Sequence, residues 1–542
     1  MESFQSIASS CQSAVLEAIP SKWRLQGRPE GTDVRHIPRS CGLMTPQQLL
    51  ITEKSATELL SELHSGSLTS VEVTEAFCAR AAIAHQCINC LTAYIYEEAI
   101  ARAAELDEIF AKSGPVGPLH GLPFAVKDYY QMKGHATTLG YVAWHSKIAL
   151  TDASIVQLFK KCGAIPFART TMPQTGMMLQ TVSNLWGRTL NPYNTGFSAG
   201  GSSGGDGSLV GMRGSPFCAS TDIGGSIRAP ATFNGLYGIR PTAERIPKNG
   251  LVTTAPGQVS IKVSSGPVCH SVADIKLVTK LLLSHFEYIG YESTAVPMPW
   301  REVKVKEKLR FGLLKYDGVV KPQPPILRAL DETAASLKRA GHEDLFSPTT
   351  AVVEFELPFD AWDVALTTWR LYFQTGAAEV KAVAASTGEP LMSNFSWYLD
   401  TFDIKPLTVP ELFQLNAKQA ENKRQFFEAW KAANIDALIC PCAPSAGFPH
   451  DFPVWWGYFS LWNVLDYPST ILPLKGFKID PVIDAKDFKY VPKENVFDKM
   501  NWEVYDPVLW GNQPVCIQIV RPPYTDEELI DVTERVDEIC NS

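Results

Sequence analysis

The pattern of apolar positions predicts helices along the first hundred residues. Residues 1–54 read as an N-terminal arm with one short helix at about 5–18. The stretch "SATELLSELHSG" predicts a helix with Ser55 as its N-cap, and "TSVEVTEAFCARAAIAHQ" predicts a second with Ser70 as its N-cap. Apolar residues at helical spacing predict a third helix over 97–114.

Further along, short apolar runs alternate with helical stretches. The runs that predict buried strands are "LPFAVKD" (122–128), "AIPFART", "KLRFGLLKYD", "IDALICP" and "PVCIQIV" (514–520). Helical spacing appears in "ASIVQLFKKCG" and again from Pro324, with Gly341 past the end of the helix. This alternation indicates an α/β fold with a mostly parallel or mixed sheet. We expect one domain over 55–542, in which the mainly helical segment 354–432 covers one side of the sheet.

Composition and charge narrow the class of protein. The chain has 542 residues, of which 45% are hydrophobic, so it can bury a large core. The net charge is −8 and the basic residues are scattered, which argues against nucleic acid as a partner. The sequence shows no signal-peptide pattern at its start and no apolar run long enough to span a bilayer. We therefore expect a cytoplasmic protein without a membrane span.

The cysteines do not form a metal-binding pattern. Twelve are present, including the pairs in "CINC" (87–90) and "ICPC" (439–442). A structural zinc site needs a second close pair or histidines at ligand spacing, and the ten histidines are dispersed. We expect reduced, buried thiols and no metal.

Two clusters of glycine and serine, "GGSSGGDG" (200–207) and "TDIGGSIRAP" (221–230), are the most unusual feature. A flexible linker would lack the apolar residues that surround them. A phosphate-binding loop would need G-x-x-x-x-G-K-[ST] or G-x-G-x-x-G after a strand, and neither is present. A nucleophile elbow matches "GFSAG" and "GSSGG", but "TLNPYNT" before them is polar and no histidine stands in a favourable context.

A fourth interpretation uses both clusters for acyl transfer. The turn "DIGGS" can aim backbone N–H groups at one point and ends at a serine, Ser226, which could act as a nucleophile. Lys127 follows the apolar run "LPFAV", and burial would keep its amine neutral enough to act as a base.

These residues resemble the amidase signature family, and in particular its fungal acetamidase-type members. The motifs "GLPFAVKD", "GGSSGGDG" and "TDIGGSIRAPATFNGLYGIRPT" carry the resemblance, with Lys127 75 residues before Ser202 and Ser202 24 residues before Ser226. Stretches such as "GRTLNPYN" and "WGNQPVCIQIV" extend it from about residue 12 to the C-terminal part. The resemblance implies a large mixed β-sheet covered by helices on both faces, a small-molecule amide substrate and no cofactor. Homodimers occur in the family, so a homodimer is possible here.

The resemblance also implies roles for individual residues. Ser226 would form an acyl-enzyme, Lys127 would be the neutral base, and Ser202, preceded by a cis peptide bond, would relay the proton between them. Backbone N–H groups of Ile223, Gly224, Gly225 and Ser226 would bind the oxyanion of the substrate.

Neighbouring residues would support this triad. Ser203 would hydrogen-bond near it, Asp222 and Arg228 would hold the nucleophile turn, and Gly176 would contact the substrate. Asp206 departs from the family pattern, in which glutamate is more usual, and we interpret this as a change in packing.

The substrate stays open at this level. The aromatic stretch 452–467, together with Trp369 and 392–402, is interpreted either as core packing or as the wall of an acyl pocket. The function is a general amidase, a pathway-specific hydrolase of a secondary metabolite or fatty-acyl amide, or, from another class, a non-catalytic scaffold or transamidase subunit.

Overall fold

The computed structural model describes residues 3–27, 30–342 and 352–542, and one large mixed sheet organises them. From edge to edge its eleven strands among the described residues are β1 (Leu91–Tyr94), β3 (Ile165–Thr170), β2 (Pro123–Lys127), β6 (Phe217–Asp222), β8 (Ser264–Cys269), β7 (Tyr237–Arg240), β12 (Ser469–Pro473), β13 (Cys516–Val520), β11 (Ala437–Pro441), β9 (Phe311–Leu313) and β10 (Val352–Glu354).

The strand directions vary across the sheet, and the edge strand β1 pairs antiparallel with β3. β2 runs parallel to both β3 and β6, and β9 runs parallel to both β10 and β11. Between these groups, β6, β8, β7, β12, β13 and β11 pair antiparallel. The predicted α/β fold with a mixed sheet is confirmed. β2 and β6 lie side by side, so the residues at their carboxyl ends meet at one edge of the sheet.

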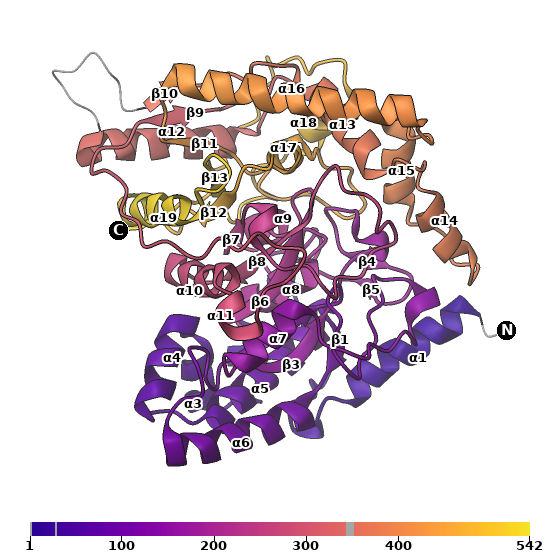
Figure 1. Cartoon of the computed structure of the whole chain (residues 1–542), viewed down its shortest axis with the longest axis vertical. Coiled ribbons are helices and arrows are strands. Elements are labelled where there is room, and N and C mark those ends of the chain that lie inside the picture. The colour runs from indigo at the N-terminus through magenta and orange to yellow at the C-terminus, as the bar shows by residue number, and fades with distance from the viewer. Residues whose placement is uncertain (1–2, 28–29, 343–351) are drawn as a thin grey trace.

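Helices cover both faces of this sheet, as predicted, and Figure 1 shows α3, α4 and α6 at one end of the molecule and α16 at the opposite end. The described helices are α1 (Phe4–Glu17), α2 (Ile37–Ser40), α3 (Pro46–Thr52), α4 (Ala56–Ser65), α5 (Ser70–Ile88), α6 (Tyr96–Ser113), α7 (Ser154–Lys161), α8 (Gly204–Gly211), α9 (Arg228–Phe233), α10 (Val272–Leu283), α11 (Phe286–Ile289), α12 (Pro324–Leu337), α13 (Ala361–Tyr372), α14 (Ala378–Ala385), α15 (Ser393–Thr401), α16 (Val409–Ala433), α17 (Gly457–Leu465), α18 (Val496–Val504) and α19 (Asp526–Asn541). None of the described helices is long and apolar enough to cross a membrane.

Two details of the N-terminal region differ from the sequence-based expectation. The arm holds α1, α2 and α3 and not a single helix. Thr45 begins α3 with a capping box to Gln48. The N-cap of α5 is Thr69 and not Ser70, since the Thr69 side chain accepts from the Glu72 N–H. The Ser55 cap of α4 is confirmed, again with a capping box.

The segment 354–432 is mainly helical. It contains α13 to α16, and both α13 and α16 pack against α17. The division of the chain into an arm and one domain stays a prediction.

Candidate active site

Lys127 is the last residue of β2, and its side chain is completely buried. Its Nζ donates to Ser202 Oγ at 2.8 Å and to Thr221 Oγ1 at 2.9 Å. Burial lowers the pKa of Lys127 from 10.5 to about 7, although the carboxylates of Asp206 and Asp222 oppose this shift. Lys127 can therefore exist as a neutral amine near neutral pH.

Ser202 lies in the loop between Gly200 and the start of α8. The peptide bond between Gly201 and Ser202 is cis, as the resemblance implied. A Cβ at Gly201 would lie 2.6 Å from the Met178 carbonyl oxygen, so only glycine fits this close approach. Ser203, the N-cap of α8, donates its N–H to the Ser226 carbonyl oxygen at 3.2 Å and joins the loop to the nucleophile turn.

The turn that carries Ser226 connects β6 to α9 and is held by a buried ion pair. Arg228 Nε lies 3.0 Å from Asp222 Oδ2, and both side chains are fully buried. Burial alone would raise the pKa of Asp222, but Arg228 overcomes this and holds it well below its usual value. Asp222 also accepts the N–H groups of Gly225 at 2.8 Å and Ile227 at 3.0 Å. The pair is therefore a buried anchor and not a surface ion pair.

The backbone N–H groups of this turn are not equivalent. The Gly225 N–H donates to Asp222 at 2.8 Å, so in this structure it already has an acceptor. The N–H groups of Ile223, Gly224 and Ser226 have no acceptor among the residues that the structure describes. These three are the ones free to bind an oxyanion.

Ser202, Ser226, Ile223 and Gly176 line one cavity of about 1070 Å³. The two serines are 3% and 4% exposed, so the cavity reaches them at its buried end. Within the described ranges the Ser226 hydroxyl has no hydrogen-bond partner, so its contact with Ser202 is not formed in this structure. The other walls come mainly from 248–263 and 372–380.

The aromatic stretch 452–467 does not line this cavity, and neither do Trp369 or 392–402. Trp369 is fully buried, stacks on Phe402 and packs against Trp456. A Cβ at Gly224 would lie 3.1 Å from the Trp456 ring, and one at Gly225 would lie 2.6 Å from Phe459. These contacts favour the packing interpretation, because the Trp456 and Phe459 side chains pack against the turn that carries Ser226.

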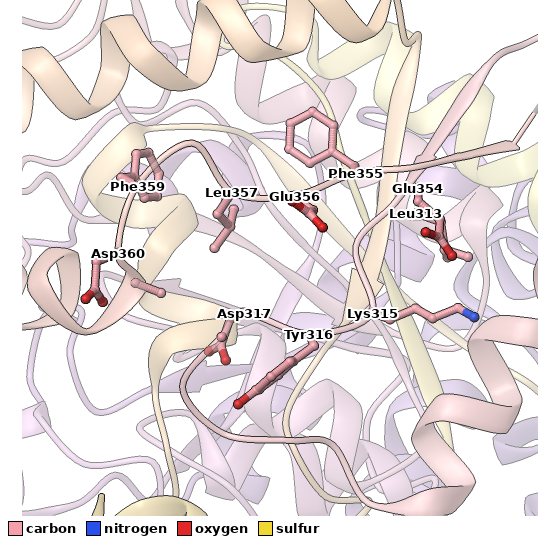
Figure 2. A pocket seen from close by; sticks show the side chains of 12 residues that line it. Leu313, Lys315, Tyr316, Asp317, Glu354, Phe355, Glu356, Leu357, Phe359 and Asp360 are labelled. Atoms are coloured by element: carbon pink, nitrogen blue, oxygen red, sulfur yellow. The ribbon is translucent and has the colours of Figure 1, made fainter. Parts of the chain in front are cut away.

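A second cavity, of about 560 Å³, lies elsewhere in the molecule. Figure 2 shows the rings of Tyr316, Phe355 and Phe359 around it, with the carboxylate of Asp317 nearby. Burial raises the pKa of Asp317 to about 6, but its carboxylate is already bound by the indole N–H of Trp455 at 2.6 Å and by two backbone N–H groups. None of the predicted site residues lines this cavity, whereas Ser202, Ser226, Ile223 and Gly176 all line the first.

Sequence reasoning missed three contributors to the site. Thr221 is a direct partner of Lys127, and Tyr372 donates to the Ile223 carbonyl oxygen at 2.7 Å. Asp206, interpreted as a packing change, is a fully buried carboxylate whose charge acts on Lys127. The position of Thr221 directly before Asp222 at the end of a strand was the available signal for its role. In the described part of the chain no group of His, Cys, Asp and Glu residues could hold a metal ion.

Comparison with known proteins agrees with this geometry. The sequence matches the Amidase family over residues 72–530, and the chain belongs to that family. It is 47% identical to an amidase of Gibberella zeae, with all of both chains covered. It is 37% identical to an acetamidase of Emericella nidulans, covering 100% of this chain and 99% of the relative.

Among solved structures, the fold is similar to that of a fatty acid amide hydrolase. The TM-score is 0.93 at 31% sequence identity, covering 99% of this chain and 95% of the other. Like its relatives, the protein is an amidase, a hydrolase that acts on amide bonds.

Proposed function

We propose that the protein hydrolyses a carboxamide to a carboxylate and ammonia or an amine through an acyl-enzyme on Ser226. The observation that carries this proposal is the 2.8 Å hydrogen bond between the buried amine of Lys127 and Ser202, at the end of the cavity that Ser226 also lines. A neutral lysine can take a proton through Ser202, and a serine activated in this way can attack a carbonyl carbon.

The steps follow from the positions of these groups. Ser226 Oγ attacks the substrate carbonyl while its proton passes to Ser202 and the Ser202 proton passes to Lys127. The free N–H groups of Ile223, Gly224 and Ser226 bind the oxyanion, and each such donor contributes about 3–4 kcal/mol in the transition state. The proton then returns to the leaving nitrogen, and water releases the acid from the ester.

The test uses Ser226→Ala, Ser202→Ala and Lys127→Met in the full chain with a panel of amides. Released ammonia or amine is the readout, and mass spectrometry detects the acyl adduct. We expect no turnover and no adduct in Ser226→Ala, and strongly slowed acylation in the other two variants. Wild-type turnover in Ser226→Ala would refute the nucleophile assignment.

The size of the cavity favours a bulky substrate. Ligand cavities commonly span about 300–1,000 Å³, and about 1070 Å³ far exceeds what a two-carbon amide fills. Leu139, Met177 and Phe373 contribute apolar wall. We therefore expect a higher kcat/KM on amides of long or aromatic acids than on acetamide, and the reverse order would favour a general small-amide hydrolase. We also propose that the protein acts in the cytoplasm; its possible homodimer remains a prediction.

A further inference from the structure

Asp206 lies directly after the relay loop, in the first turn of α8, and its side chain is completely buried. Ser220 Oγ donates to its Oδ2 at 2.6 Å, and Thr170 Oγ1 donates to its Oδ1. Thr170 pairs with Lys127 across the sheet, and Ser220 precedes Thr221, the second partner of the lysine amine. The Asp206 carboxylate thus binds one hydroxyl from each of the two strands that flank β2.

The geometry points to Asp206 as a positioning residue for the proton relay: its carboxylate is the buried countercharge that stabilises the Lys127 ammonium while the substrate is acylating Ser226. This inference rests on the proposed function, because it takes Lys127 as the base. It goes further by giving a role in the reaction to a residue that touches neither substrate nor nucleophile.

Two carboxylates act on Lys127, and they differ in what neutralises them. Asp222 is paired with Arg228, so most of its charge is already compensated. Asp206 has no cation within ion-pair distance among the described residues, and its donors are hydroxyl groups. A hydroxyl stabilises a carboxylate without cancelling its charge. Asp206 is therefore the carboxylate whose field is left to act on the relay.

The protonation states of the pair suit this role. Burial raises the pKa of Asp206 to about 6, while Lys127 and the hydroxyl donors oppose that shift. With the pKa of Lys127 at about 7, Lys127 is a neutral amine and Asp206 is an ionised carboxylate above neutral pH. When the relay delivers a proton, the new ammonium forms within the field of the Asp206 carboxylate, although the two groups do not form an ion pair. Both side chains are buried, where Coulomb attraction is stronger than in water.

Among the described residues, the other titratable groups that feel the charges of this pair keep one protonation state in this range. The Tyr129 ring lies 5.6 Å from Lys127 Nζ, and burial raises the pKa of Tyr129 to about 12. Burial likewise raises the pKa values of Tyr130, Cys90 and Cys218, all of which feel the Asp206 charge, so they stay protonated. The acid limb of the pH profile, which is the rise of the rate from acidic to neutral pH, therefore reports on Lys127 and Asp206.

The experiment compares Asp206→Asn with the wild-type full chain, using kcat and kcat/KM from pH 5.5 to 9.5 on one amide that the wild type hydrolyses. The asparagine keeps the shape and removes the charge. Because the carboxylate raises the pKa of Lys127, its loss should move the acid limb to lower pH by about one unit. The plateau of kcat should fall about tenfold, since the ammonium loses its countercharge, while KM changes little.

Asp274→Asn is the matched control. Asp274 is also a buried carboxylate in the first turn of a helix, α10, and it accepts from the N–H and hydroxyl of Thr57. A general effect of removing a buried carboxylate would appear in both variants. We expect the control to lose stability and to keep the wild-type acid limb.

Asp206→Glu keeps the charge and decides the question if Asp206→Asn does not fold: its acid limb should stay at the wild-type pH. An acid limb of Asp206→Asn at or above the wild-type position would overturn the inference, as would a downward shift in Asp206→Glu. Failure of the proposed function looks different, because Lys127→Met or Ser226→Ala would then retain turnover. Inactive triad variants together with an unshifted Asp206→Asn would refute this inference alone.

Discussion

Replacing Arg228 with leucine should both destabilise the protein and slow the reaction. Arg228 binds Asp222 through Nε and Nη2, each at 3.0 Å. Its guanidinium also donates to the Phe459 carbonyl oxygen at 2.9 Å, Gln518 Oε1 at 3.0 Å and Asn463 Oδ1 at 2.6 Å. Leucine leaves the Asp222 carboxylate buried without a counter-ion, and breaking a buried pair in this way costs about 3–5 kcal/mol.

The size of the thermal effect follows from the chain length. An unfolding entropy of about 2.1 cal/mol/K per residue gives about 1.1 kcal/mol/K for 542 residues. A loss of about 3–5 kcal/mol then lowers the melting temperature by about 3–4 °C. Because Asp222 shapes the turn through the Gly225 and Ile227 N–H groups, kcat should also fall at least about tenfold at a temperature where the variant is folded.

Calorimetry and initial rates measure the two effects. Arg228→Lys keeps the charge but cannot reproduce the planar fork, so it should recover part of the stability and little of the rate. Arg424→Leu is the control, because Arg424 pairs with Glu421 and Glu428 on the exposed surface of α16 and should leave the melting temperature unchanged. If Arg228→Leu had the same melting temperature as Arg424→Leu and kept the wild-type kcat, the anchoring role of the Asp222–Arg228 pair would be wrong.

Three further predictions concern the relay, the turn and the cavity. With the pKa of Lys127 at about 7, kcat/KM should rise about tenfold from pH 6 to pH 8, and a maximum near pH 5 would exclude a lysine base. Gly225 has φ +123° and a Cβ there would lie 2.6 Å from Phe459, so Gly225→Ala should lower kcat at least about tenfold. Gly476→Ala is the control, because a Cβ there would meet no atom within 4 Å. Equal kcat in the two variants would show that the turn tolerates a side chain at Gly225. Val380→Phe narrows the cavity and should lower kcat/KM more on a bulky amide than on acetamide, and equal losses on both would place Val380 away from the bound substrate.

Lys127, Ser202 and Ser226 could be predicted from the sequence better than the residues that surround them. Lys127 was predictable because an apolar run leads directly to it, and that run is the buried strand β2. The glycines around Ser202 and Ser226 were predictable as close backbone approaches, since no other residue type leaves room for them. Both signals are local in the sequence, which is why they could be recognised without a structure.

Other features depend on contacts between distant segments. β7 and β8 are short and contain glycine, so neither shows the alternation of a half-buried strand, and pairing across the centre of the sheet stabilises them. The segment 248–263 carries no motif that the sequence analysis singled out, yet it forms a wall of the cavity that Ser202 and Ser226 line. The stretch 452–467 was ambiguous for the same reason, because an aromatic run has the same pattern whether it faces a cavity or a core.

Asp222 and Asp206 are both buried carboxylates of the site, but their different neighbours give them different roles. Asp222 faces a guanidinium, which keeps it ionised at every working pH and makes it a fixed anchor for the nucleophile turn. Among the described residues, the Asp206 carboxylate accepts from hydroxyl groups only, and burial raises its pKa to about 6, close to that of Lys127. In the proposed relay, the charge of Asp222, which Arg228 compensates, holds the geometry of the turn. The charge of Asp206, which forms no ion pair among the described residues, stabilises the Lys127 ammonium that forms in each turnover. In the proposed mechanism the ion pair holds the turn that carries Ser226, and burial keeps Lys127 neutral at rest. The Asp206 carboxylate then stabilises the ammonium once Lys127 has accepted the proton.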